Sequence, residues 1–468
     1  MRLASGRFGA TIGIMRRLVI AGLASGSGKT TVACALLAAF ARRGWNVQPF
    51  KIGPDYIDPG HHAHIAGRAS RTLDSVLLPP GRLRALFTRA VSNADVAIVE
   101  GVMGLFDGRT GQGEVGSTAQ VAKLIDAPVV IVLDVAKVGR TAGSTALGAC
   151  RFDPALRIVG FILNRVASAS HASICTEAVE AATDLPVLGA LPRTDALALP
   201  ERRLGLVPAE EMTPSPDFRL RLASSAEAHL ALDRLWVLSD AGAVDGGDDP
   251  FPMEPQGRRA SIALAQDRAF SFYYPDSLDL LRAWGAELVP YSPLIDHGLP
   301  PGTQGVYLGG GFPELSAAEL AANLPMHVAL REAARIGLPI YAECGGLMYL
   351  GRTLTDFAGQ THTMVGLAAV DSRMDRERVT VGYRTATTLR ATPLLAAGAT
   401  VVGHEFHYSH LSEPPAPASA AYRITEPAIS VEGYADGNTL ASYVHLHFGS
   451  DPLMAQRFVQ ACARQAPV

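Results

Sequence analysis

The stretch Ala21-Gly22-Leu23-Ala24-Ser25-Gly26-Ser27-Gly28-Lys29-Thr30-Thr31 decides the fold of the first half of the chain. An apolar run ending at Ile20 precedes it and a helix-like segment over 32–43 follows, so the pattern predicts a strand, a glycine-rich loop and a helix. Such a loop turns backbone N–H groups onto phosphate oxygens, and the helix N-terminus adds partial positive charge. We expect residues 25–31 to bind ATP or GTP, with Lys29 on the β- and γ-phosphates and Thr30 on Mg²⁺.

Length and composition narrow the class of protein. The chain has 468 residues, enough for two or three domains, and a net charge of −3 with no long basic run, so nucleic acid is not an expected partner. Five scattered cysteines suit a reducing compartment. No segment approaches the roughly 20 apolar residues of a membrane span. We therefore expect a cytoplasmic protein without membrane contact, and Met15 is a second candidate for its start.

Further apolar runs follow the glycine-rich loop, and helix-like stretches such as 116–125 and 141–150 separate them. Continuous rather than alternating apolar runs predict a parallel sheet that is buried on both faces. Ligands of such sheets bind at the carboxyl ends of the strands, so candidate residues are sought there. The runs are 47–52, 96–99, 129–133, 158–163 and 187–191.

The loop after the second predicted strand carries charged and histidine side chains. Asp55 is a candidate ligand of Mg²⁺, which binds one or two protein carboxylates together with phosphate and water. Lys51 and Asp58 are candidates for contacting an anionic substrate, although a solvated loop would also explain them. The nearby histidines over 61–64 invite a zinc interpretation, but no cysteine or third spaced ligand supports it, and contact with substrate or no role at all fits better.

Two later strand ends add polar candidates. The run 97–99 ends in Glu100, which resembles a Walker B acid on the metal side of the phosphates. The run 158–163 ends in Asn164, whose amide offers both a donor and an acceptor to an adenine edge. A helix-capping asparagine is the alternative explanation for Asn164.

Three of these segments together resemble a known family. Residues 22–31, 51–59 and 99–108 are similar to the synthetase half of cobyrinic and hydrogenobyrinic acid a,c-diamide synthases, which is similar in turn to dethiobiotin synthetase. The glycine-rich loop of that enzyme shares the displaced first glycine, which accounts for Leu23 where the strict pattern has glycine. The resemblance implies that Thr30, Asp55 and Glu100 share Mg²⁺ and that Asn164 meets the base.

The second half shows a separate α/β pattern after a stretch rich in acidic residues, Gly and Pro over 239–257. We expect an ATP-binding synthetase domain over 16–238, a linker over 239–257 and a second domain over 258–466.

In the second domain a short apolar strand leads into Cys344, which is flanked by small residues and followed by a helix, as in a nucleophile elbow. The helix N-terminus favours the thiolate form of the sulfur. The glycines Gly309, Gly310 and Gly311 offer backbone N–H groups to an oxyanion. Of these, we expect Gly310 and Gly311 to be the oxyanion donors.

A cysteine nucleophile needs a base, and the chain offers several histidines. The segment 443–448 alternates at period two, which predicts a terminal strand with His445 and His447 on one face. This half resembles class I glutamine amidotransferase domains of the cobyric and cobyrinic subfamily, which implies that Cys344 is the nucleophile and His445 the base, with His447 as the runner-up. Other class I families place a glutamate two residues after the histidine, where this chain has His447, so no third triad member is identified from the sequence.

The two halves together predict a two-domain α/β enzyme that makes amides. The resemblance implies ATP-dependent amidation of the a and c carboxylates of a tetrapyrrole polycarboxylate, with ammonia from L-glutamine. Arg68, Arg71 and Arg165 are candidates for holding its carboxylates, and solvated arginines are an equally good interpretation. The alternatives are an amidotransferase for another tetrapyrrole, such as cobyric acid or nickel-sirohydrochlorin, and a non-catalytic P-loop switch protein. A homodimer is compatible with the sequence.

Overall fold

A seven-stranded, wholly parallel sheet forms the centre of the first half of the chain. The computed structural model describes residues 15–194, 197, 201–202, 205–206 and 216–468. The strand order of the sheet is β3-β2-β4-β1-β5-β6-β7, and every neighbouring pair runs parallel. Its strands are β1 (Arg16–Gly22), β2 (Val47–Ile52), β3 (Arg71–Leu73), β4 (Val96–Glu100), β5 (Val129–Asp134), β6 (Ile158–Val166) and β7 (Val187–Pro192).

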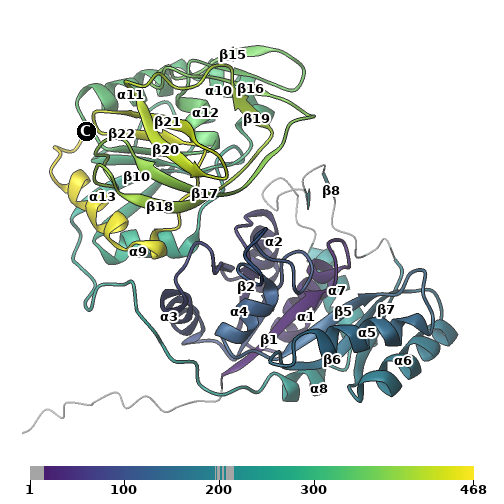
Figure 1. Cartoon of the computed structure of the whole chain (residues 1–468). Coiled ribbons are helices and arrows are strands. Elements are labelled where there is room, and N and C mark those ends of the chain that lie inside the picture. Colours follow the sequence, from purple (N-terminus) through teal and green to yellow (C-terminus); the bar gives the residue numbers. More distant parts are fainter. Residues whose placement is uncertain (1–14, 195–196, 198–200, 203–204, 207–215) are drawn as a thin grey trace, which may run out of the picture. The chain divides into compact units, whose positions relative to one another are not determined.

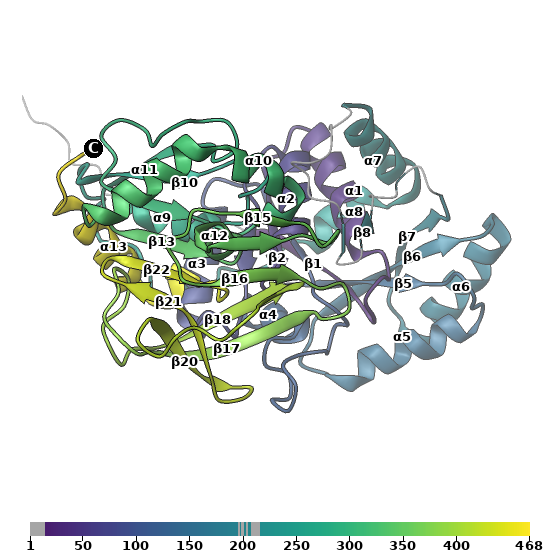
Figure 2. The same cartoon turned by 90° about the horizontal axis from the view of Figure 1, so that it is seen from above.

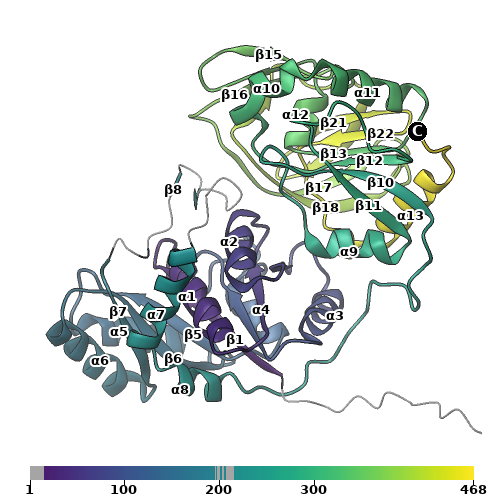
Figure 3. The ribbon, with the colours of Figure 1, turned by 180° about the vertical axis from the view of Figure 1, so that it is seen from behind.

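Helices cover both faces of this sheet, as the continuous apolar strands predict. Helix α1 is buried along its whole apolar length from Val32 to Phe40 and packs with α2, α7 and α8 on one face, while α5 and α6 lie side by side elsewhere in the unit (Figure 1 and Figure 3). The expected parallel α/β fold is thus confirmed. The helices are α1 (Lys29–Arg42), α2 (Ile57–Ala66), α3 (Pro80–Val91), α4 (Thr118–Leu124), α5 (Thr141–Phe152), α6 (Ala169–Thr183), α7 (Pro216–His229) and α8 (Leu232–Leu238), and the short strands β8 (Glu201–Arg202) and β9 (Gly205–Leu206) pair antiparallel.

The second half has its own mixed sheet of nine strands, in the order β11-β10-β12-β13-β22-β21-β20-β17-β18. The strands from β11 to β22 pair in parallel, and the antiparallel strands β21, β20, β17 and β18 extend the sheet from β22 (Figure 2). These strands are β10 (Ala260–Ala265), β11 (Ala286–Tyr291), β12 (Gly305–Leu308), β13 (Ile340–Glu343), β17 (Thr380–Thr388), β18 (Thr400–His407), β20 (Ala420–Glu426), β21 (Ser430–Asp436) and β22 (Thr439–Ser442).

Two hydrophobic clusters flank the second sheet. Helices α9 (Pro275–Ala283) and α13 (Leu453–Ala463) contribute to one cluster, and α10 (Ala317–Ala322), α11 (Leu324–Arg335) and α12 (Gly345–Leu350) contribute to the other. A small four-stranded sheet and two short 3-10 helices complete the unit. They are β14 (Thr353–Thr355), β15 (Thr361–Thr363), β16 (Asp371–Met374), β19 (Ser409–Leu411), η3 (Pro313–Ser316) and η4 (Phe448–Ser450).

The chain divides into two compact units. One contains residues up to Ser75 and from Leu83 to Asp248, and the other contains Val76–Arg82 and Asp249–Val468. The change of unit at Asp248 falls inside the segment 239–257. No helix in the described part of the chain is long and apolar enough to cross a membrane.

Candidate active sites

The glycine-rich loop joins β1 to α1 and is closely packed against Asn164. Gly28 has φ 95°, and a Cβ atom there would lie 2.0 Å from Asn164 Nδ2, so only glycine fits. Asn164 Nδ2 donates to the carbonyl oxygen of Ser27 at 2.9 Å. Asn164 belongs to β6, and the next helix is capped by Ser168, which removes the capping interpretation of the asparagine.

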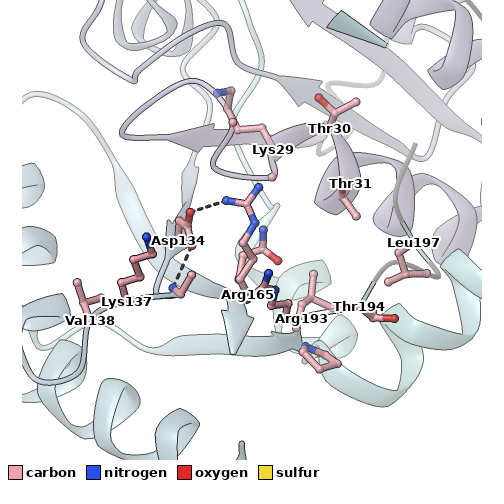
Figure 4. Close-up of a pocket in the computed structure, with 16 residues that line it drawn as sticks. Lys29, Thr30, Thr31, Asp134, Lys137, Val138, Arg165, Arg193, Thr194 and Leu197 are labelled. Carbon is pink, nitrogen blue, oxygen red and sulfur yellow. Dashed lines mark hydrogen bonds and ion pairs between the residues drawn. The ribbon is translucent and has the colours of Figure 1, made fainter. Parts of the chain in front are cut away.

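A cavity of about 710 Å³ opens beside this loop (Figure 4). Arg165 is ion-paired with Asp134 at 2.5 Å on its wall, so this arginine already has a carboxylate partner within the unit. Ser25, Ser27 and the carboxylates Asp55 and Glu100 are outside its lining. The lining residues are Gly26, Gly28, Lys29, Thr30, Thr31, Asp134, Ala136, Lys137, Val138, Asn164, Arg165, Leu191, Pro192, Arg193, Thr194 and Leu197.

A buried charge network surrounds Glu100 at the end of β4. The Thr30 hydroxyl donates to Glu100 Oε1 at 2.7 Å, and Lys51 Nζ donates to the same oxygen at 2.9 Å. Lys51 also pairs with Asp58 at 2.7 Å. The other Glu100 oxygen lies 2.6 Å from Nε2 of His62, which is 1% exposed. The structure therefore brings four predicted residues together and adds His62, which the sequence analysis did not select.

The charges of this network depend strongly on one another. Burial disfavours a charge on Glu100, but Lys51 and His62 outweigh it and hold the pKa of the carboxyl below its usual range. Burial and the neighbouring Asp58 raise the pKa of Asp55 to about 7. Burial and the neighbouring Lys51 lower the pKa of Lys29, whose amine donates to the carbonyl oxygens of Ala24 and Met103. Hydroxyl and carboxylate oxygens are the donors that Mg²⁺ prefers, so Thr30, Glu100 and Asp55 fit that ion chemically.

The histidines after β2 do not lie in a loop. Helix α2 begins at Ile57 and includes them, because Pro59 is close enough to the helix start that its missing N–H costs no hydrogen bond. No group of three His, Cys, Asp or Glu side chains in the described part of the chain is arranged to hold a metal ion, which leaves the zinc interpretation without support. Arg68, a candidate for holding substrate carboxylates, donates instead to the carbonyl oxygens of Ala90 and Asn93, which is a local structural role.

Cys344 forms a sharp turn between β13 and α12, as the elbow pattern predicts. Its φ of 48° and ψ of −101° are strained for a non-glycine residue, and its side chain is 4% exposed. The following turn is tight, because a Cβ atom on Gly346 would lie 2.7 Å from the carbonyl oxygen of Leu308. The backbone N–H of Cys344 donates to Ser442 at 2.7 Å, which ties the elbow to β22.

The glycine run after β12 lies beside the elbow. The N–H of Gly310 donates to the carbonyl oxygen of Phe272 at 3.3 Å, so it is engaged in a backbone bridge. The nitrogen of Gly311 lies 3.2 Å from the position that a Cβ atom on Gly345, the residue after Cys344, would occupy. Of the two predicted oxyanion donors, the geometry favours Gly311.

The terminal strand predicted over 443–448 is wrong, because β22 ends at Ser442. His445 forms only an isolated bridge with His404, and side chains accept hydrogen bonds from four other N–H groups of the segment. Tyr443 N donates to Glu432 at 2.7 Å, Val444 N to Ser442 Oγ at 2.9 Å, Leu446 N to Glu343 Oε1 at 2.9 Å and Phe448 N to Ser277 Oγ at 3.0 Å. All six residues of this irregular segment are buried, so the alternation of apolar residues does not mark a strand with one exposed face.

The two candidate bases have different surroundings. The His445 side chain is hydrogen-bonded to Cys344, and its Nδ1 lies 3.6 Å from Glu343 Oε2. Burial opposes its charge, but these two partners raise the pKa of His445 to about 10. His447 instead accepts from the N–H of Gly449 through Nδ1 and packs its ring 4.8 Å from that of Tyr274. The structure places His445, not His447, next to Cys344.

Comparison with known proteins matches both halves of the chain. A family model described as the CobQ/CobB/MinD/ParA nucleotide binding domain matches residues 18–207, and one described as a CobB/CobQ-like glutamine amidotransferase domain matches residues 261–453. Proteins named cobyrinate a,c-diamide synthase from Synechococcus and Salmonella typhimurium are each 44% identical, over 95% of this chain and 98% of their own length. A protein named hydrogenobyrinate a,c-diamide synthase from Streptomyces coelicolor is 42% identical, over 95% and 97%.

Proposed function

The chain belongs to the family of cobyrinate and hydrogenobyrinate a,c-diamide synthases, and we propose that it amidates the a and c side-chain carboxylates of a corrin ring in cobalamin biosynthesis, using ATP and glutamine. The observation that carries the proposal is the presence of two sites in one chain. The first unit has a phosphate-binding loop joined to a carboxylate network, and the second has a cysteine elbow bonded to a histidine. The near full-length relatives set aside the P-loop switch alternative.

In the first unit, ATP would transfer its γ-phosphoryl group to a substrate carboxylate. Residues 25–31 would hold the phosphates, Lys29 would neutralise charge that develops on them, and Asn164 would contact the base. Mg²⁺, held by Thr30, Asp55 and Glu100, would supply further charge neutralisation. Lys51 and Asp58 belong to the network around Glu100 and are proposed to contact the corrin carboxylate as well. The product is an acyl phosphate, which ammonia can attack.

In the second unit, the Cys344 thiolate would attack the side-chain amide carbon of glutamine. His445 gives its proton to the departing nitrogen, so ammonia leaves as the C–N bond breaks. The Gly311 N–H stabilises the oxyanion of the tetrahedral intermediate. Water then hydrolyses the thioester, which releases glutamate and returns the proton to His445.

Further proposals concern the domain boundaries, the location and the assembly of the enzyme. We propose the domain boundaries 16–238 and 258–466 with 239–257 as linker, a cytoplasmic location, and a homodimer as the assembly to test by sedimentation. The relatives bear both cobyrinate and hydrogenobyrinate names, so assays with cobalt-bearing and cobalt-free rings decide the preferred substrate.

Replacing Cys344 tests the division of labour. Cys344→Ala should abolish glutamine-dependent synthesis, because no other group forms the thioester, while synthesis from ammonium salts continues at the wild-type rate. Product mass and ADP release measure both reactions. If free ammonia failed to support synthesis in this variant, the two-site mechanism would be refuted.

A further inference from the structure

Glu343, the residue directly before the nucleophile, is buried and 1% exposed. No pattern in the sequence assigns it a role, and the position two residues after the base, where other families carry a glutamate, holds His447 here. We propose that Glu343 is the positioning residue of the glutaminase, which orients His445 and stabilises its imidazolium form. This inference rests on the proposed glutaminase function of the second unit.

The contacts of Glu343 suit an ionised carboxylate, which only accepts hydrogen bonds. Its Oε1 accepts from the N–H of Leu446 at 2.9 Å and from the hydroxyl of Tyr341. Its Oε2 accepts from the hydroxyl of Tyr307 at 3.2 Å and lies 3.6 Å from His445 Nδ1. Burial and the Glu343 carboxylate hold the pKa of both tyrosines well above its usual value, so they remain donors.

The pairing of β13 with β22 brings the Glu343 carboxylate and the His445 ring close together. Glu343 is the last residue of β13 and pairs with Ser442, the last residue of the parallel strand β22, and His445 follows three residues later. Glu343 also bonds the N–H of Leu446, which directly follows His445, so one carboxylate contacts both the ring and the backbone of the base. Since Glu343 faces Nδ1, the other ring nitrogen is left for Cys344. This is the arrangement that orients a catalytic imidazole.

The other groups near His445 do not compete for this role. His404 faces it from β18, but burial and the positive charge of His445 lower the pKa of His404 to about 3, so it stays neutral. Glu432, the other carboxylate that accepts from the 443–448 segment, bonds to Ser442 Oγ and Tyr443 N. Glu432 is therefore a matched control.

The test compares Glu343→Gln with Glu432→Gln in the full-length protein. The pH profile of iodoacetamide alkylation at Cys344 and the kinetics of glutamate release are measured for both. For Glu343→Gln we expect the half-maximal alkylation rate at higher pH, and a kcat for glutamate release that is lower by about 10²–10⁴-fold with little change in the KM for glutamine. The pH profile of Glu432→Gln should match the wild type. Glu343→Asp, which keeps the charge, should recover part of the lost kcat.

A merely structural role for Glu343 predicts a different outcome. In a His445→Ala background, Glu343→Gln should cause no further loss of Cys344 reactivity, because its effect passes through the histidine. An unchanged pH profile, or an equal further loss in that background, would overturn the proposal. Should Glu343→Gln not fold, Glu343→Asp keeps the charge but shortens the side chain, and it should shift the pH profile in the same direction by less. Because Cys344→Ala tests the glutaminase separately, failure of this inference would leave the proposed function intact.

Discussion

Replacing Lys51 by methionine should destabilise the first unit more than any surface change of equal charge. Lys51 Nζ lies 2.7 Å from Asp58 and 2.9 Å from Glu100, and its side chain is 5% exposed. Removing one partner of a buried ion pair costs about 3–5 kcal/mol, because the remaining charge is left without compensation. For a unit of this size each kcal/mol lowers the Tm by about 2–4 °C, so Lys51→Met should lower it by about 6–20 °C.

The matched control is Lys123→Met. Lys123 also contacts two carboxylates, Glu114 at 2.5 Å and Asp153 at 2.7 Å, but its side chain is 27% exposed. Solvated pairs contribute about 1 kcal/mol or less, so this variant should melt within about 4 °C of the wild type. Differential scanning calorimetry of ligand-free protein, which separates transitions of different units, measures both variants.

The Tm difference between Lys51→Met and the wild type should depend on pH in a definite direction. Because the pKa of Glu100 is lowered by folding, its contribution in the wild type is present above its unfolded pKa of about 4.3 and is lost as the pH falls through the folded value. In Lys51→Met the unpaired carboxylates can take up protons instead, so the Tm deficit should narrow as the pH falls from 8 to 5. A deficit no larger than that of Lys123→Met, or one that widens on acidification, would refute the assignment of Lys51 as the central cation of the network.

Two further predictions concern catalysis. Glu100→Gln should abolish ATP-dependent synthesis at saturating Mg²⁺ while glutamate release by Cys344 remains, and undiminished synthesis would exclude Glu100 from the site. His445→Ala should slow alkylation of Cys344 at neutral pH and remove glutamate release, since the pKa of His445 is raised to about 10 and its imidazolium is lost only as the pH rises through that value. His447→Ala should do neither to a comparable extent, and the reverse result would make His447 the base.

The fold and the sharp turn at Cys344 were predictable because their signals are local. A parallel sheet shows as apolar runs, and both the glycine-rich loop and the Cys344 elbow are contiguous in sequence. The partners of these residues were harder to predict. His62 contacts Glu100 from a helix 38 positions earlier in the chain, and from the sequence it was only one of several neighbouring histidines for which substrate contact or no role was expected. Glu343 acts on a residue 102 positions later, which no spacing rule in a single sequence connects.

The irregular segment that follows β22 has a consequence for attempts to move this glutaminase chemistry onto another scaffold. Apart from one backbone bridge to His404, the segment that carries His445 is held by side-chain acceptors, not by the repeating ladder of a strand. Glu343, Glu432 and Ser277 contribute them from separate parts of the unit, and Ser442 contributes one from the end of β22. A transplanted loop with the right length and backbone would therefore carry a histidine of undefined orientation. The portable module is the set of anchoring side chains, and an engineer would have to graft those first.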